Sequence, residues 1–154
     1  MKLYRFSPIK SEKDLMKAIK YISIQSTKLC KKTIGKELKI SYLTVFSHYE
    51  KEYKSLENIL NKIGKYYNEN NGLRVTLNKP IKVGKNVITH LRVRKPDPYR
   101  KQVGCSDFDV NYNEFKAKYL GVKNLRLIER SDYEMIEFHD PGFYVLAYAV
   151  SKPV

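Results

Sequence analysis

Hydrophobic residues recur at helical spacing through the first quarter of the chain. Four of them lie three, four or seven residues apart and therefore share one face of a helix. They are Leu15, Ile19, Ile22 and Leu29. Ser11 with Asp14 three residues later is a pair that caps a helix start, and Gly35 is a residue type that commonly ends one. The pattern predicts a long helix between Ser11 and Gly35.

The pattern then changes to that of a strand followed by a second helix. Residues 38–46 ("LKISYLTVF") are rich in β-branched and aromatic side chains, which favour strands. Ser47 and Glu50 form a second capping pair, and the helix that they predict ends in the "NENNG" of residues 68–72. Its apolar stripe consists of Tyr53, Leu56, Leu60, Ile63 and Tyr67.

The rest of the chain predicts mainly strands. Short β-branched or alternating segments separated by Gly, Pro and Asn cover residues 2–6, 73–77, 86–94, 124–130, 133–138 and 143–150. One further short helix is predicted at residues 111–121. This order favours an α+β fold in which two helices cover one face of a sheet. We expect a single domain over residues 1–154, with a largely antiparallel sheet, two long helices and one short helix.

The segment 95–110 fits neither pattern. Loops longer than about 12 to 15 residues in compact domains are usually functional or disordered. Pro96 and Pro98 favour extended geometry in the residues before them, and Tyr99 adds an aromatic ring to a basic stretch. Two interpretations stay open: an arm that binds an anionic partner, or a loop that covers a sheet edge and blunts it with charge.

Charge changes the picture further. The chain has 30 basic and 16 acidic residues, a formal net charge of +14 that attracts polyanions. Lysine abundance alone also follows from a nucleotide-biased genome, but three of the seven arginines fall within nine residues, at Arg92, Arg94 and Arg100. Arginine grips phosphate with a planar fork. Residues 129–140 are acidic by contrast. We therefore expect positive and negative charge to be concentrated in different regions of the molecule.

These features favour a small intracellular protein that binds nucleic acid through its phosphate backbone. The expected contact residues are Arg92, Arg94, Lys95, Tyr99, Arg100 and Lys101. Single-stranded RNA or DNA is favoured over duplex, because no predicted helix carries the residues of a major-groove reader at its start. We expect no cofactor, no membrane partner and a cytoplasmic location, and a homodimer is possible. Cys30 and Cys105 have no second Cys or His at metal spacing, so we expect ordinary thiols and no metal.

An enzymatic alternative rests on two histidines. His48 stands at the start of the second predicted helix, where an anion can bind, and a neutral histidine there can act as acid or base. Capping or packing is its simpler role. His90 alternates with Arg92 and Arg94 and predicts a cationic row on one strand face. The alternative function is therefore a phosphodiesterase or nuclease with His48 or His90 beside the arginines. His139 precedes a "DPG" turn and is interpreted as a turn residue.

Acidic residues give only a weak indication of a metal-dependent nuclease. Pro96–Asp97 followed by "EFK" at Glu114 matches a restriction-nuclease pattern, but the helical spacing around Glu114 turns it away from Asp97. Asp107 and Asp109 share one side of an extended segment and could hold a divalent cation, although a solvated acidic loop is the simpler interpretation.

Two resemblances accompany these patterns. The order of strands and helices around "YLTVF" resembles half of a 2H phosphoesterase, whose defining feature is a pair of His-x-Thr motifs. This chain has Tyr42, Leu43 and Thr44 at the first position and His90, Leu91 and Arg92 at the second, so the resemblance implies the fold and argues against that activity. The segments "HYEKEY", "RKPDPYRKQVG" with "SDF", and "EMIEFHDPGFYVLAY" resemble a group of small bacterial proteins, which implies no function. A third function class, a protein-interaction module, also stays open.

Overall fold

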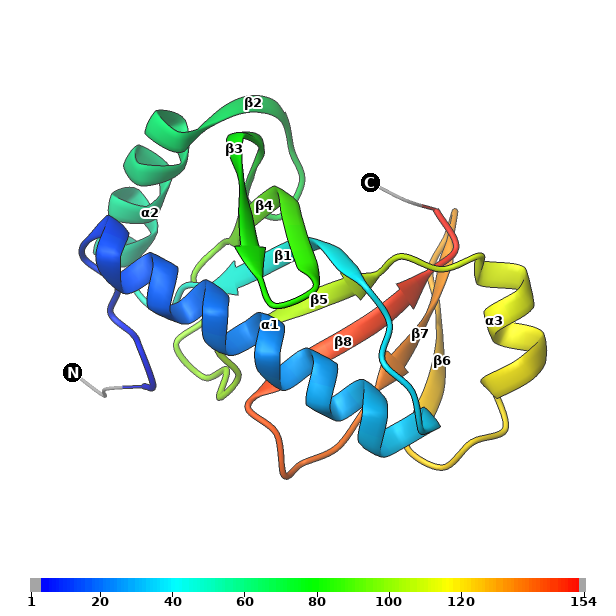
Figure 1. Cartoon of the computed structure of the whole chain (residues 1–154). Helices are drawn as coiled ribbons and strands as arrows, with labels where there is room; N and C mark the ends of the chain where they lie inside the picture. The colour runs from blue at the N-terminus through cyan, green and yellow to red at the C-terminus, as the bar shows by residue number, and fades with distance from the viewer. Residues whose placement is uncertain (1–3, 153–154) are drawn as a thin grey trace.

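The computed structural model describes residues 4–152, which form an α+β structure with a single eight-stranded sheet (Figure 1). The helices in this part of the chain are α1 (Glu12–Ile34), α2 (Glu50–Ile63) and α3 (Tyr112–Tyr119). The strands are β1 (Ile40–Phe46), β2 (Gly64–Glu69), β3 (Leu73–Val83), β4 (Asn86–Arg94), β5 (Gly104–Phe108), β6 (Leu125–Glu129), β7 (Glu134–Phe138) and β8 (Val145–Val150).

The sheet is mixed, which corrects the expectation of a largely antiparallel one. Its strand order is β2-β3-β4-β1-β5-β8-β7-β6. The β1/β4 and β5/β8 pairs are parallel, whereas the remaining neighbours are antiparallel. The helices have 23, 14 and 8 residues, a graded series instead of two long helices and one short one.

The two halves of the sheet share one topology. β1, α2, β2, β3 and β4 form a strand, a helix and three strands, and the first strand pairs in parallel with the last. β5, α3, β6, β7 and β8 repeat this arrangement. The halves meet where β1 and β5 pair antiparallel, so the centre of the sheet is also the junction between the halves.

All three helices pack on the same face of the sheet and share one hydrophobic core. The helical stripe predicted for the first helix is confirmed, because its four apolar side chains are fully buried in α1. Ser11 caps that helix by accepting a hydrogen bond from the Asp14 backbone at 3.2 Å, and Gly35 ends it with a positive φ of 79°. α1 crosses the sheet in front of β1, β5 and β8 (Figure 1).

Side chains that alternate with this core point to the opposite face, which carries no helix among the described residues. Phe46, Cys105 and Leu146 form a small separate cluster there, with Tyr148 packed against it. Because successive residues of a strand face opposite sides, the same alternation brings Tyr42, Thr44, Arg92 and Arg94 to this open face. Polar and charged side chains are therefore concentrated on the open face.

The start and end of the second helix differ from the prediction. The Ser47 hydroxyl donates to the Arg94 carbonyl at 2.6 Å instead of capping α2, whose N-cap is Tyr49 with no capping hydrogen bond from its side chain. The helix ends at Ile63, and residues 64–69 form the edge strand β2. The strand predicted at residues 2–6 lies partly outside the described residues, and Tyr4 and Ser7 form only an isolated bridge.

The predicted loop 95–110 contains a strand. Residues 104–108 form β5, which lies in the middle of the sheet between β1 and β8. The irregular part is therefore confined to residues 95–103, between two strands that flank β1. No helix among residues 4–152 is long and apolar enough to cross a membrane.

Candidate functional site

A pocket of about 460 Å³ opens on the face opposite the helices. It crosses the junction between the two halves, with β1, β3 and β4 on one side and β5, β7 and β8 on the other. The turn at Asn70–Asn71 and the turn at Arg130–Tyr133 form opposite parts of its rim. Five basic and two acidic side chains line it: Arg74, Arg92, Arg94, Arg130, Lys152, Asp107 and Asp132.

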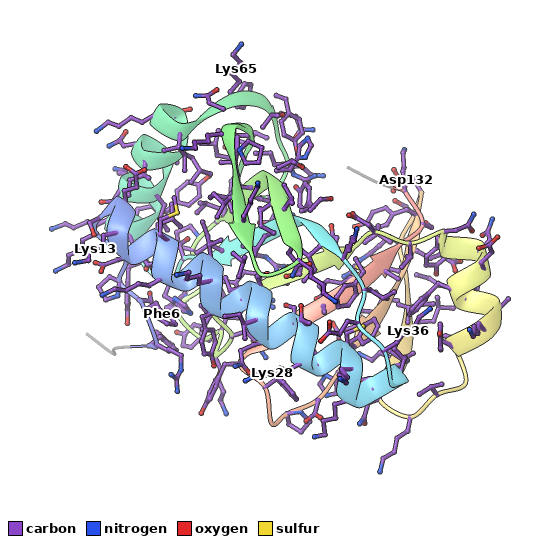
Figure 2. The ribbon with its side chains drawn as sticks, in the orientation of Figure 1. Phe6, Lys13, Lys28, Lys36, Lys65 and Asp132 are labelled. Atoms are coloured by element: carbon purple, nitrogen blue, oxygen red, sulfur yellow. The ribbon has the colours of Figure 1, made fainter. Side chains whose placement is uncertain are left out.

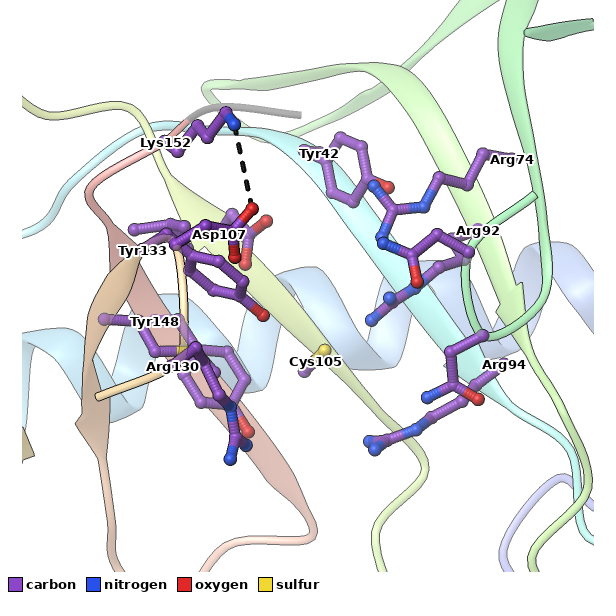
Figure 3. A pocket seen from close by; sticks show the side chains of 15 residues that line it. Tyr42, Arg74, Arg92, Arg94, Cys105, Asp107, Arg130, Tyr133, Tyr148 and Lys152 are labelled. Atoms are coloured by element: carbon purple, nitrogen blue, oxygen red, sulfur yellow. Dashed lines mark ion pairs between the residues drawn. The ribbon is translucent and has the colours of Figure 1, made fainter. Parts of the chain in front are cut away.

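Three arginines form one wall of this pocket (Figure 3). Arg74 and Arg92 are register partners on β3 and β4, and Arg94 lies two residues further along β4 on the same face. Strand pairing therefore sets the three side chains side by side. Arg92 donates from Nε to the Thr44 hydroxyl at 3.1 Å, which fixes its guanidinium over β1. We call Arg74, Arg92 and Arg94 the arginine wall.

Arg74 is the most unusual member of the wall. It is only 5% exposed, and its Nε and Nη1 atoms have no hydrogen-bond partner among residues 4–152. Its guanidinium carbon lies 5.9 Å from the centre of the Tyr42 ring, which gives a weak cation–π contact. Buried charges are normally paired, since an unpaired one costs several kcal/mol of desolvation. Arg74 thus lines the pocket with a guanidinium whose enclosed Nε and Nη1 donors are unused among residues 4–152.

The arginine wall continues toward the loop through Phe46. The guanidinium carbons of Arg94 and Arg100 lie 5.3 Å and 5.0 Å from the centre of the Phe46 ring. Burial, followed by repulsion from Arg100, lowers the pKa of Arg94 below its ordinary value. Within residues 4–152, the one carboxylate that approaches either of these two cations is that of Asp97, 3.7 Å from Arg100. An anion would relieve their mutual repulsion.

The opposite wall is aromatic (Figure 3). Tyr133 and Tyr148 line it together with Arg130, and Cys105 lies between the two walls on the floor. Lys152 is partly neutralised by Asp132 at 3.8 Å. The arginine wall therefore faces two phenol rings and one further guanidinium across the pocket.

Asp107 places a carboxylate in this basic surrounding. It belongs to β5, where it pairs with Tyr42 of β1 and Tyr148 of β8. Burial raises its pKa to about 6, against the opposing effect of Arg92 and Arg74. The carboxylate is therefore mostly ionised at neutral pH, and it makes no hydrogen bond to residues 4–152.

The basic loop of residues 95–103 is held at both ends of its path. The Asp97 backbone donates to the Ser47 carbonyl at 3.1 Å, the Tyr4 hydroxyl bonds the Pro98 carbonyl, and the Val103 backbone donates to the Tyr144 carbonyl at 2.7 Å. Tyr99 is 89% exposed, and Lys95 and Lys101 are exposed beside it. The loop joins two central strands, so the alternative that it covers a sheet edge is wrong: the edges are β2 and β6.

His48 is buried and contacts other parts of the fold. Its ring is 1% exposed and stacks on Tyr4 with a centroid distance of 4.0 Å. Nδ1 lies 2.8 Å from the Ser7 hydroxyl and Nε2 lies 2.7 Å from the Arg100 carbonyl. With both nitrogens engaged and no exposed surface, the ring is not placed to accept a substrate proton.

His90 and His139 do not line the pocket either. His90 shares the open face of β4 with the arginine wall, but its ring lies between Tyr42 and Tyr67, and its Nδ1 lies 2.8 Å from the Thr89 hydroxyl. His139 is exposed near the "DPG" turn, where the Phe143 backbone donates to the Asp140 carbonyl at 3.1 Å. The geometry does not bring either histidine to the pocket.

The acidic candidates are separated in the fold. Asp107 faces the pocket, whereas Asp109 accepts a hydrogen bond from the Ser41 hydroxyl at 2.7 Å. Glu114 stands in the first turn of α3 and Asp97 in the loop beyond β4. Residues 4–152 contain no group of three His, Cys, Asp or Glu side chains that could hold a metal ion.

Sequence reasoning missed most of the pocket. Arg92 and Arg94 were predicted contact residues and line the arginine wall, while Lys95, Tyr99, Arg100 and Lys101 belong to the loop that leaves it. The missed residues are Arg74, Arg130, Tyr133, Tyr148 and Lys152. Period-two alternation in "LRVTL" could have placed Arg74 opposite the core, but only the β3/β4 register shows that it meets Arg92.

The lysines of the first helix lie on another surface. Six of them are exposed along α1, on the side of the sheet away from the pocket: Lys13, Lys17, Lys20, Lys28, Lys31 and Lys32. Figure 2 shows Lys13 and Lys28 along α1, in front of the sheet. They provide matched controls for effects of net charge.

Comparison with known proteins supports the fold alone. No protein-family model matches this chain, and no curated protein sequence matches it. A solved structure described as "Structural Genomics, Protein EC4020" is similar, with a TM-score of 0.67 and 12% sequence identity. The match covers 97% of this chain and 93% of that chain, so the two share a fold over nearly their full lengths.

Proposed function

We propose that the protein binds nucleotide phosphate in the pocket, as part of a single strand of RNA or DNA. The observation that carries this proposal is the buried guanidinium of Arg74, whose Nε and Nη1 atoms lack partners among residues 4–152. A phosphate bound against this guanidinium would compensate its buried charge, and Arg92 and Arg94 stand beside it to share the charge. Arginine forks hold phosphate in two places at once, which gives direction as well as affinity.

The surroundings of the pocket favour a single strand. Proteins that bind single strands combine a basic groove for the backbone with aromatic rings on which bases stack. Here the arginine wall supplies the cations, and Tyr133 and Tyr148 supply rings on the facing wall. Arg94 and Arg100 on Phe46 extend the cations toward the loop that exposes Tyr99. A strand with one nucleotide in the pocket can continue along this path.

A second candidate is a free nucleotide or another small phosphorylated molecule. The pocket volume of about 460 Å³ lies within the range of small-molecule sites, roughly 300 to 1,000 Å³. Both candidates use the same phosphate chemistry at the arginine wall. They differ in whether the loop of residues 95–103 contributes to affinity.

Fluorescence anisotropy separates these candidates. Labelled single-stranded RNA, single-stranded DNA and duplex DNA are titrated over a salt series, and unlabelled nucleoside monophosphates serve as competitors. The test variant carries Arg74→Met, Arg92→Met and Arg94→Met, and the matched control carries Lys13→Met, Lys17→Met and Lys28→Met on α1. Both variants lose three charges, so a difference between them reports the place of the charge and not its amount.

We expect the wild-type protein and the lysine control to bind single strands alike and the arginine variant to lose binding. The slope of log affinity against log salt should fall by about 0.7 for each phosphate contact removed. Arg74→Met alone should leave the free energy of unfolding unchanged or raise it by about 1 to 4 kcal/mol, because an apolar side chain replaces an unpaired buried charge. Equal weakening by both triple variants would reject the pocket. Binding of monophosphates without binding of strands would support the second candidate.

A further inference from the structure

Phosphate binding does not account for Asp107. A site built only for an anion gains nothing from a carboxylate, because the two negative charges repel. Yet Asp107 lines the pocket on the central strand β5, half-buried, across from the arginine wall. Arg92 and Arg74 influence it electrostatically, but neither approaches it closely enough to form an ion pair. No hydrogen bond from residues 4–152 reaches its oxygens.

The pocket therefore holds two unused groups of opposite kind. Arg74 has enclosed donors without acceptors among residues 4–152, and Asp107 brings a carboxylate to the same pocket without a hydrogen bond from that part of the chain. Burying either group is unfavourable unless it is paired. A ligand that satisfies both must carry an anionic group toward the arginine wall and N–H donors toward β5. The phenol rings of Tyr133 and Tyr148 lie on the same side of the pocket as Asp107 (Figure 3). A flat group can stack on such rings, so we expect the part of the ligand that carries the N–H donors to be flat.

A nucleotide has this division between its phosphate and its base, but the four bases differ in what they present to a carboxylate. On its Watson–Crick edge guanine carries two adjacent donors, N1–H and the N2 amino group, which match the two oxygens of one carboxylate. Adenine and cytosine place a ring-nitrogen acceptor beside the amino group. Uracil places carbonyl acceptors on both sides of its single N–H. Each of these directs at least one lone pair at the carboxylate.

We infer that the pocket selects guanine, with Asp107 accepting from the guanine N1–H and N2 amino groups while the phosphate of the same nucleotide faces Arg74, Arg92 and Arg94. This inference rests on the proposed function and names its base preference. Asp107 then acts as the specificity-determining residue and the arginine wall as the source of affinity. Removing Asp107 should change which base binds without abolishing binding.

The experiment compares short oligouridines that carry one central guanine, hypoxanthine or adenine. Hypoxanthine keeps N1–H but lacks the N2 amino group, so the guanine-to-hypoxanthine affinity ratio isolates the second hydrogen bond. We expect about tenfold tighter binding of the guanine strand at neutral pH, and a ratio near one for Asp107→Asn. Plain oligouridine should bind Asp107→Asn at least as well as wild type, because a negative charge has been removed. Binding of oligouridine by Asp107→Asn also shows that this variant is folded.

A pH series tests the same residue independently. Since the ionised carboxylate is the acceptor, the guanine preference should be present above about pH 6 and fade as the pH falls through that value. Arg74 and Arg92, the cations that face Asp107, stay charged throughout this range, and Asp109 is the acidic neighbour that acts on it. Asp107→Asn should show no such change in the ratio.

The outcomes separate the two claims. Equal binding of all three strands, or a guanine preference that survives in Asp107→Asn, overturns the guanine inference and leaves phosphate binding in place. Failure of every strand and of GMP to bind overturns the proposed function and the inference with it. If only monophosphates bind, the second candidate function holds. The ratio of GMP affinity to IMP affinity then measures the preference for guanine over hypoxanthine in a free nucleotide.

Discussion

At the scale of single residues, a buried polar network ties the N-terminal segment to the rest of the fold. The Ser7 hydroxyl lies 2.7 Å and 2.8 Å from the two Glu52 oxygens, and the Ile9 and His48 backbone groups donate to the same carboxylate at 2.6 Å and 2.7 Å. His48 adds its ring, with Nε2 toward the Arg100 carbonyl. A residue predicted as a catalytic candidate thus links α2, the N-terminal segment and the basic loop.

Replacing Glu52 by Gln should destabilise the protein strongly. An amide cannot accept as many hydrogen bonds as a carboxylate, and its NH2 group would face other donors in a site that is 3% exposed. Breaking a buried polar pair in this way costs about 3 to 5 kcal/mol of unfolding free energy. Urea denaturation measures it, with Glu50→Gln on the exposed first turn of α2 as the control. A loss below about 1 kcal/mol would contradict the network's importance.

The Glu52 carboxylate also makes the stability difference between wild type and Glu52→Gln depend on pH. Burial acts to raise the pKa of Glu52, but hydrogen bonds from His48, Ser7 and Ile9 outweigh it and lower the pKa below its ordinary value. A lowered folded-state pKa contributes stability that is fully present above the unfolded value of about 4.3 and is lost as the pH falls toward the folded value. The advantage of wild type over Glu52→Gln should therefore shrink below about pH 4.

At the scale of elements, long amphipathic patterns were predictable and short buried strands were not. The spacing of α1 is unambiguous over 23 residues. By contrast, Tyr67 falls four residues after Ile63 and continues the helical stripe, although the chain turns into β2 at Gly64. The strand β5 ("GCSDF") contains residue types that seldom favour strands, and its place between β1 and β8 depends on contacts distant in sequence.

Gly104 shows what holds β5 in the centre of the sheet. A Cβ atom at this position would lie 2.2 Å from the Thr44 carbonyl oxygen and 2.5 Å from the Ile22 side chain. The absence of a side chain therefore allows β5 to approach β1 beneath α1. The central position of the strand, and with it the orientation of Cys105 and Asp107 toward the pocket, depends on this contact.

Gly104→Ala should lower the free energy of unfolding by about 1 to 3 kcal/mol, because neither the β1 backbone nor the buried Ile22 can move away freely. Gly121→Ala is the matched control, since nothing lies within 4 Å of the added methyl group there. Denaturant midpoints of the two variants give the comparison. Equal midpoints would mean that the sheet accommodates the methyl group and that the close approach is not required.

At the scale of the whole molecule, the site arises from the meeting of two halves with one topology. The first half contributes the arginine wall and the second contributes Asp107 and the tyrosines. Alternation along β4 was enough to predict that Arg92 and Arg94 share a face. The facing wall could not be predicted, because it depends on the β1/β5 pairing, and the sequence pattern predicts a loop where β5 lies.

The extent of the binding surface can be tested through Tyr99. If a strand continues from the pocket past Phe46 to the loop, a base can stack on this ring, which is 89% exposed. Stacking contributes about 1 to 3 kcal/mol for each base, so Tyr99→Ala should weaken binding of an oligonucleotide by about fivefold or more. Binding of a mononucleotide, which occupies only the pocket, should not change.

Tyr66→Ala provides the control for that measurement. Tyr66 is 58% exposed, but it pairs with the core residue Val75, which places its ring on the helix-covered side of the sheet. It should therefore leave both affinities unchanged. If Tyr99→Ala also leaves oligonucleotide affinity unchanged while the arginine wall remains essential, the ligand ends within the pocket and the loop has no part in binding. That result would favour a free nucleotide over a strand, since only a strand needs the path along Arg94 and Arg100.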